Sequence, residues 1–406
     1  MLGLELIYCH HIDKFNAIGT AKINYSAIDT GPNSFQIRPS HLLFEDSVNP
    51  QQIKYVYKNE FPCYFPINDS DLIFDPLAAC FYVISRYEEY VLNQKDQHQR
   101  FPATASLQHK TNCLHLPIAQ IWSILLADAL KEKFPSISFH MPEYRFLPTY
   151  DIDMAWSYRE KGFFRSMGAC LKSIGSLDFL SIKERWKVAT KQLRDPFDTY
   201  DYIERQNNDN QLNAIYFFLL GVHSAYDKNI SPTNAKLIQL IKEISLKNNV
   251  GIHPSYYSEK NLKREINSLS QILKKEIKVS RQHYVRLILP GTYDRLIANN
   301  ISDDYTMGYP DMIGFRNGLA IASPWYNLST EQETELIIHP FQIMDVTLKN
   351  YLQLTPDKAL EKIRSTIDTV KKYGGTCISI WHNSSFDTQW SEWKKVYEEM
   401  LSYASK

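Results

Sequence analysis

FLPTYDIDMAWSY, residues 146–158, joins an apolar run to two carboxylates and sets the interpretation of the whole chain. Its first residues are apolar or β-branched, which predicts a buried strand. Asp151 and Asp153 follow at the strand end, and residues two apart in a strand face the same side. Two like charges this close are unfavourable unless a cation or a shared proton offsets them. The stretch therefore suggests a metal or proton site at a strand end.

A plainer interpretation of the two aspartates needs only local structure. Asp151 would start a turn, and Asp153 would cap a helix that begins near Ala155. The choice between the two interpretations depends on whether later parts of the chain supply partners for such a site.

Length and charge limit the classes of function. The chain has 406 residues, enough for two domains with sizeable cores. Lysine plus arginine and aspartate plus glutamate both number 45, so the formal net charge is zero. This balance argues against electrostatic capture of nucleic acid or of an anionic membrane. The many tyrosines and phenylalanines would suit sugar stacking, and they would equally suit an ordinary core.

The cysteines and the N-terminus predict a cytoplasmic protein. The six cysteines are scattered, without a paired C-x-x-C motif, which is typical of free thiols in a reducing compartment. The first residues, MLGLELIYCHHIDKF, lack the cationic start and apolar core of a secretion signal. No apolar run reaches the length of about eighteen residues expected of a membrane span.

Residues 1–144 have the character of a separate mixed α/β accessory domain. Short apolar runs alternate with Asn, Pro and Gly, and two amphipathic helices are predicted, after Asp75 and over residues 116–133. Arg86, Glu88 and Glu89 lie at the far end of the first helix. We interpret them as an ion-pair cluster rather than as catalytic residues.

From residue 145 onward, strand-like runs alternate with helical segments. Further strands are predicted at residues 214–220, 250–253, 278–280 and 376–381, and helices near residues 182–193, 234–248, 261–275 and 356–373. Such alternation indicates a parallel sheet, open or closed. The number of β/α steps favours a barrel over residues 145–406.

Several polar side chains follow these predicted strands. His253 follows VGI, His382 ends TCISIWH, and RQH places Arg281 and His283 after a third strand. A lone histidine of this kind is most often bonded to a loop carbonyl. Together with Asp151 and Asp153, however, the histidines form a group of titratable residues at strand ends. Such a group is less likely to arise by chance than a single histidine in that position.

This set predicts the chemistry of a metal-assisted amide hydrolase. A divalent ion held by one carboxylate and one or two imidazoles keeps open positions for water and a carbonyl. A second carboxylate can take the proton from that water, and a histidine can protonate the leaving amine. An arginine can keep the base carboxylate ionised.

The motifs resemble the polysaccharide deacetylase superfamily, also called the NodB-homology superfamily or carbohydrate esterase family 4. TYDID at 149–153 is similar to its first motif, GIHPSYYS at 251–258 to its metal-binding motif, SRQHY at 280–284 to its arginine motif, and ISIWHN at 378–383 to its last motif. Phrases such as FDPLAACFYVISRYEEY, DYTMGY and GFRNG extend the likeness to a Bacteroidetes-type branch with an extra N-terminal domain.

The resemblance implies a distorted (β/α) barrel and a role for each matching residue. Asp151 would be the general base, Arg281 would keep it charged, and His382 would be the general acid. Asp153 and His253 would bind the metal. The usual second motif has two histidines four residues apart, but Tyr257 stands at the second position here. His283 is the candidate replacement as third ligand.

Two further residues are candidates for substrate binding. Asp304 in DDYTMGY and Arg316 in GFRNG both lie in glycine-containing loops after strand-like segments. The alternative is a turn aspartate and a surface arginine. His339 and Asp345 are expected to be structural.

The leading functional prediction is a divalent-metal enzyme, with zinc expected, that removes acetyl groups from an N-acetylated sugar or polysaccharide. Its partner would be a carbohydrate or another N-acetylated small substrate, without nucleic acid or membrane. One alternative is a catalytically silent carbohydrate-binding or scaffold protein. Another is a hydrolase of a non-sugar C–N bond.

Overall fold

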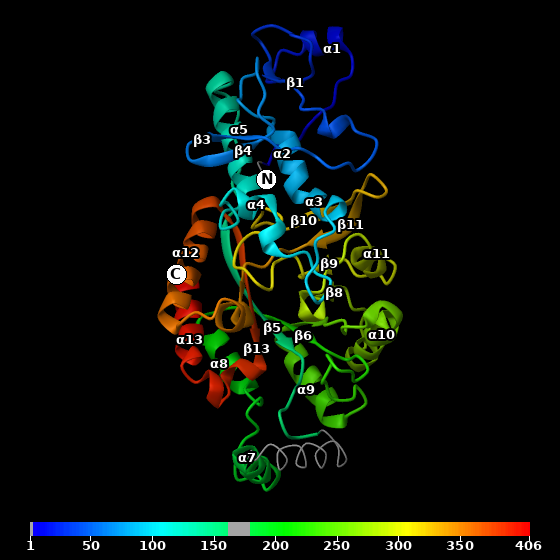
Figure 1. The fold of residues 1–406 in the computed structure, drawn as a ribbon, viewed down its shortest axis with the longest axis vertical. Coiled ribbons are helices and arrows are strands. Elements are labelled where there is room, and N and C mark those ends of the chain that lie inside the picture. The colour runs from blue at the N-terminus through cyan, green and yellow to red at the C-terminus, as the bar shows by residue number, and fades with distance from the viewer. Residues whose placement is uncertain (1–2, 161–178) are drawn as a thin grey trace.

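A computed structural model describes residues 3–160 and 179–406 (Figure 1). A mixed α/β arrangement fills the described chain, with the first 135 residues at one end of the long axis and a large sheet beyond them. No helix in these two ranges has the length and apolar character needed to cross a membrane.

One sheet of nine strands organises the later part of the chain, in the order β10-β11-β9-β8-β7-β6-β5-β13-β12. All neighbouring pairs are parallel except β10 with β11. The strands are β5 (Tyr144–Ile152), β6 (Ile215–Phe218), β7 (Asn249–Ile252), β8 (Val279–Ser280), β9 (Asp303–Asp304), β10 (Ser323–Asn327), β11 (Gln332–Ile338), β12 (Ile343–Met344) and β13 (Gly375–His382).

Strand β5 pairs with β6 on one side and with β13 on the other. Its last residues, from Pro148 to Ile152, are all buried, as the apolar run predicts. Proline lacks an N–H group and is rarely tolerated in a central strand. Pro148 is accommodated because the pairing with β6 starts one residue later, at Thr149.

Helices lie to both sides of this sheet in the view of Figure 1: α12 and α13 are on the left, and α9, α10 and α11 are on the right. Their apolar faces join one hydrophobic cluster with the sheet. The helices of this part are α7 (Phe179–Ala189), α8 (Tyr200–Asp209), α9 (Ala235–Ser245), α10 (Leu262–Leu273), α11 (Gly291–Ile297), α12 (Pro356–Tyr373) and α13 (Trp393–Ala404).

The first 135 residues pack around a second hydrophobic cluster that includes Tyr64 and Trp122. Leu319 and Leu328 from the later chain also belong to this cluster. The α-helices and strands of residues 3–135 are α1 (Ile12–Ala17), β1 (Ile23–Tyr25), β2 (Phe35–Ile37), β3 (Tyr55–Lys58), β4 (Phe61–Tyr64), α2 (Pro76–Ile84), α3 (Tyr87–Val91), α4 (Leu107–Lys110) and α5 (Ile118–Lys133). A domain boundary at residue 144 stays a prediction.

The helix predicted after Asp75 is two helices, α2 and α3. They separate at Arg86, whose backbone takes a left-handed conformation with φ 57°. This turn directs the buried guanidinium of Arg86 toward the carboxylates of Glu88 and Glu89, at 2.9 and 2.8 Å. The ion-pair cluster expected from the sequence is therefore present, and it explains why the helix is interrupted.

Three other expectations have different outcomes. Residues 154–160 contain no helix, so the plainer interpretation of Asp153 as a helix cap is wrong. The mixed α/β class and the parallel-rich sheet are confirmed, but among the described residues the strand pairings run linearly from β10 to β12, and a barrel is not confirmed. Five cysteines are free thiols, and Cys170 lies outside the described residues.

Candidate metal centre

Three ligand-type side chains converge at the carboxyl ends of the parallel strands. Asp153 follows β5, His253 follows β7, and His283 lies in the turn after β8. Asp153 Oδ1 lies 3.2 Å from His253 Nε2 and 3.5 Å from His283 Nε2. One ligand atom from each residue falls within 4.8 Å of the other two. One carboxylate and two imidazoles are a common donor set for a divalent transition metal.

The second nitrogen of each histidine is already engaged. His253 Nδ1 donates to the backbone oxygen of Arg281 at 2.6 Å, and His283 Nδ1 donates to Asp227 Oδ1 at 2.8 Å. These bonds leave Nε2 of each neutral ring as the nitrogen that can bind a metal. Histidines that bind metals usually have such a hydrogen-bond partner on their second nitrogen.

Asp153 Oδ1 provides an independent test of whether a cation fits. This oxygen is buried and lacks a well-aligned hydrogen bond, although Nε2 of His253 and of His283 face it at 3.2 and 3.5 Å. A buried carboxylate oxygen without a donor is costly, and a bound cation would remove that cost. The donor set and this unpartnered oxygen both fit a divalent ion held by Asp153, His253 and His283.

The charges around Asp153 favour its ionised form. Burial opposes ionisation, but the neighbouring histidines outweigh it and hold the pKa of Asp153 well below the usual range. Burial likewise disfavours a charged His283, yet Asp153 and Asp227 raise the pKa of His283 to about 9. A metal would therefore displace a proton from His283, because imidazole binds metals in its neutral form.

Asp151, the second carboxylate, lies beside this group and is paired with Arg281. Arg281 Nη1 donates to Asp151 Oδ1 at 3.0 Å and to Thr149 Oγ1 at 2.6 Å, and its side chain is fully buried. The guanidinium also lies over the ring of Phe217, 4.4 Å from its centroid. Asp151 Oδ2 is 3.9 Å from His253 Nε2. Arg281 thus supplies a fixed positive charge beside Asp151, next to the ligands.

His382 approaches the same group from β13, the neighbour of β5. Its Nε2 atom lies 3.8 Å from Asp153 Oδ2, and its Nδ1 donates to Asp345 Oδ1 at 2.8 Å. Burial disfavours the imidazolium, but Asp345, Asp153 and Asp151 raise the pKa of His382 to about 10. A protonated His382 can therefore face a leaving group near Asp153.

The structure does not support the two substrate-binding predictions. Asp304 is fully buried, and its carboxylate accepts hydrogen bonds from Ser280 and Thr306 at 2.7–2.9 Å. Arg316 is also fully buried and pairs with Glu89 at 2.7 Å. Both side chains are occupied by internal partners, so neither is available to line a cleft.

Sequence reasoning missed two residues that orient the site. Asp345 holds His382 and also accepts from Ser385 Oγ at 2.5 Å, although we expected it to be merely structural. Asp345 directly follows the strand β12, but this strand has only two residues and gives no periodic signal in the sequence. Asp227 lies in a loop without periodicity, which gave no signal. Tyr257 is half exposed and is not part of the three-ligand group.

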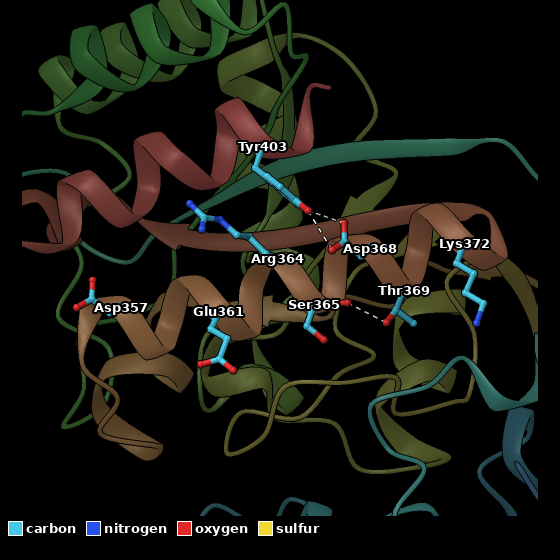
Figure 2. Close-up of a pocket in the computed structure, with 8 residues that line it drawn as sticks. All are labelled: Asp357, Glu361, Arg364, Ser365, Asp368, Thr369, Lys372 and Tyr403. Atoms are coloured by element: carbon cyan, nitrogen blue, oxygen red, sulfur yellow. Dashed lines mark hydrogen bonds between the residues drawn. The ribbon is translucent and has the colours of Figure 1, made fainter. Parts of the chain in front are cut away.

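A separate surface pocket of about 580 Å³ lies on α12 (Figure 2). It is lined by charged and polar side chains, and Tyr403 on α13 donates to Asp368 across it at 2.7 Å. No residue of the three-ligand group lines this pocket.

Comparison with known proteins assigns no function to this arrangement. Residues 1–135 match a family model described as a family of unknown function, DUF7033. No curated protein matches the chain significantly.

Several solved structures of polysaccharide deacetylases are similar at low identity. A Mycobacterium smegmatis protein that is provisionally described as a polysaccharide deacetylase is 13% identical, with a TM-score of 0.43, over 66% of this chain and 85% of that chain. The Bacillus cereus polysaccharide deacetylase is 12% identical, with a TM-score of 0.29, over 50% and 80%. A mutant of a carbohydrate esterase family 4 pseudoenzyme with restored activity is 9% identical, with a TM-score of 0.30, over 64% and 65%. These values are too low to assign a family.

Proposed function

We propose that this protein is a metal-dependent hydrolase that removes the acetyl group from an N-acetylated sugar or a related amide. One observation carries the proposal: Asp153, His253 and His283 converge beside two charged pairs, Asp151–Arg281 and His382–Asp345. The sugar as substrate class is supported only by the sequence motifs, since the geometry itself does not distinguish one amide from another.

Each residue has a task in this proposal. Asp153, His253 and His283 would hold a divalent ion, with zinc the leading candidate, which when bound would polarise the acetyl carbonyl and acidify water. Asp151 takes a proton from the attacking water, and Arg281, paired with Asp151 at 3.0 Å, holds that carboxylate in place.

His382 completes the reaction. The water oxygen bonds to the carbonyl carbon, the C–N bond then breaks, and His382 Nε2 gives its proton to the departing amine. Asp345 holds Nδ1, so that Nε2 points toward Asp153 and the reacting atoms. The products are acetate and a free amine, and the proton taken by Asp151 balances the proton lost by His382.

The test combines metal analysis with acetate release from N-acetylglucosamine oligomers and a panel of simple N-acetyl amides. Wild-type protein should bind about one divalent ion and release acetate from at least one substrate class. Asp153→Ala should lose both properties. Asp303→Ala is the matched control, because Asp303 is a nearby sheet carboxylate that pairs with His339 at 2.8 Å.

The same assay separates the alternatives. Release from simple amides alone would favour a non-sugar C–N hydrolase. The exchange of the usual second histidine for Tyr257 is the feature that favours a catalytically silent binding protein. Metal-replete protein that releases no acetate from any substrate would move that alternative ahead.

A further inference from the structure

A short segment of the N-terminal part, residues 96–100, contacts the turn that carries His283. Arg100 is almost fully buried, with 3% of its surface exposed. Its Nη1 atom donates to the backbone oxygen of Tyr284 at 2.7 Å, and its Nη2 atom donates to the hydroxyl of Tyr351 at 3.1 Å. Asp96, in the same segment, accepts a hydrogen bond from Arg100 Nε at 2.7 Å and thereby fixes the orientation of the guanidinium.

The turn held by Arg100 has an unfavourable backbone conformation. Tyr284 and Val285 have φ values of 59° and 53°, in the left-handed region that non-glycine residues avoid. A branched residue such as Val285 is especially disfavoured there. Such a conformation persists only where its surroundings enforce it. His283, the candidate third ligand, directly precedes these two residues, so its position depends on the strained turn.

His98 attaches the same segment to the loop after the other histidine ligand. Its Nδ1 lies 3.1 Å from the hydroxyl of Tyr256, three residues beyond His253. Its ring lies 4.9 Å from that of Tyr284 between centroids. Arg286 donates to the backbone oxygens of both His98 and Tyr256, at 3.2 and 2.9 Å. The segment therefore touches the loops of both histidines at once.

We propose that residues 96–100 position the metal centre, and that Arg100 does so by holding the strained Tyr284–Val285 turn so that His283 faces Asp153. The inference rests on the metal site of the proposed function. It assigns a task to the part of the chain that matches only a family of unknown function. Arg100 is a positioning residue, because it acts on His283 through the backbone of Tyr284 and touches neither ligand atom.

The test measures zinc affinity by competition with a chromophoric chelator, and the absorption spectrum of the cobalt-loaded protein. Arg100→Met keeps the length and the buried volume but removes every donor. Outer partners of metal ligands typically contribute a factor of about 10–100 in affinity, and we expect Arg100→Met to lose a similar factor and to change the cobalt spectrum. Arg100→Lys retains a charge and a donor, so it should recover most of the affinity.

Two matched variants separate positioning from general damage. Tyr351→Phe removes one hydrogen-bond partner of Arg100 but leaves the bonds to Tyr284 and Asp96, so zinc affinity should stay unchanged. Glu89→Gln breaks a buried ion pair away from the ligands, so it should lower stability without lowering zinc affinity. If either control loses as much affinity as Arg100→Met, the positioning role is wrong.

Glycine at residue 284 tests the strain directly. Glycine accepts positive φ readily, so Tyr284→Gly should relieve part of the strain and make the turn less dependent on Arg100. Arg100→Met should then cost less affinity in the Tyr284→Gly background than in the wild type. If Arg100→Met alone does not fold, the double variant is compared with Tyr284→Gly. If the double variant binds zinc about tenfold or more weakly than Tyr284→Gly does, or if the double variant does not fold, the inference is overturned.

The outcomes also separate this inference from the proposed function. Wild-type protein that binds neither zinc nor cobalt would remove the metal site and the proposed hydrolase with it. Wild-type protein that binds zinc, with unchanged affinity in Arg100→Met, would leave the proposed function intact and reject only the positioning role.

Discussion

Asp345 accepts a hydrogen bond from Nδ1 of His382 at 2.8 Å, and this contact turns the opposite nitrogen, Nε2, toward Asp153. The backbone N–H of His382 donates to the same carboxylate at 2.8 Å. Both the ring orientation and the position of the proton on His382 are therefore set by one residue, which directly follows the neighbouring strand β12.

Asp345→Asn should lower kcat by about a hundredfold or more, the usual range for a misdirected proton-transfer group, because an amide no longer fixes the ring proton on Nδ1. KM and zinc content should change little, since Asp345 contacts neither the proposed ligands nor the substrate position. Steady-state kinetics of acetate release with metal analysis measures this split. Ser385→Ala, which removes only one donor to Asp345, should have a much smaller effect. An unaltered kcat in Asp345→Asn would exclude the orienting role.

Asp151→Asn should remove most turnover, by about a hundred- to ten-thousandfold, because the water would lose its base. The substitution keeps the shape of the side chain, so zinc content should stay near that of the wild type. The control is Asp303→Asn, which changes a carboxylate on the same sheet outside the ligand group. Wild-type rates in Asp151→Asn would rule out this residue as the base.

His283→Ala should weaken zinc binding by more than the factor of about 10–100 typical of outer partners, because it removes a direct ligand. Tyr257→Phe should leave zinc affinity unchanged, because Tyr257 lies outside the three-ligand group. Competition titration of both variants measures the difference. The assignment of His283 as the third ligand fails if the two variants bind zinc equally well.

Glu89→Gln should lower the free energy of unfolding by about 3–5 kcal/mol at neutral pH, the usual effect of breaking a buried ion pair. Glu89 is buried between Arg86 and Arg316, at 2.8 and 2.7 Å. Burial alone would raise its pKa, but Arg316 and Arg86 outweigh burial and lower the pKa of Glu89 below its ordinary value of 4.5.

The sign of the pH dependence follows from that lowered pKa. The stabilisation by Glu89 is fully present above pH 4.5, and it is lost as the pH falls through the lower pKa of the folded state. The stability difference between wild type and Glu89→Gln should therefore be constant near neutrality and shrink in acid. Urea unfolding at several pH values measures it, and a difference that grows toward acid would contradict the assignment.

The sequence predicts the centre of the sheet well, because β5, β6 and β13 are apolar runs long enough to be recognised. The ligand candidates followed from the polar residues after such strands. Strands β9 and β12 have two residues each and carry no periodic signal, so Asp304 was interpreted as a loop residue and the importance of Asp345 was underestimated. Closure of the sheet depends on its edge strands, which local patterns do not specify.

Long-range pairing explains the remaining errors. The glycines of GFRNG suggested an exposed loop, yet Arg316 is buried because Glu89, far earlier in the chain, neutralises it. Asp227 was missed because its importance comes from its contact with His283, and no local pattern marks that contact. Propensity and periodicity describe neighbours in sequence, and these contacts join distant segments.

The cluster of Arg86, Glu89 and Arg316 has a consequence for how this protein can evolve. Glu89 is the shared counter-ion of two buried guanidinium groups, Arg86 from the first 135 residues and Arg316 from the later part of the chain. A neutral replacement of Glu89 leaves the buried guanidinium of Arg316 without its carboxylate partner, whereas coordinated replacement by apolar residues avoids that cost. Substitutions at these three positions should therefore arise together among relatives, and a recombinant that joins the first 135 residues of one relative to the sheet of another should fold only when the charges match.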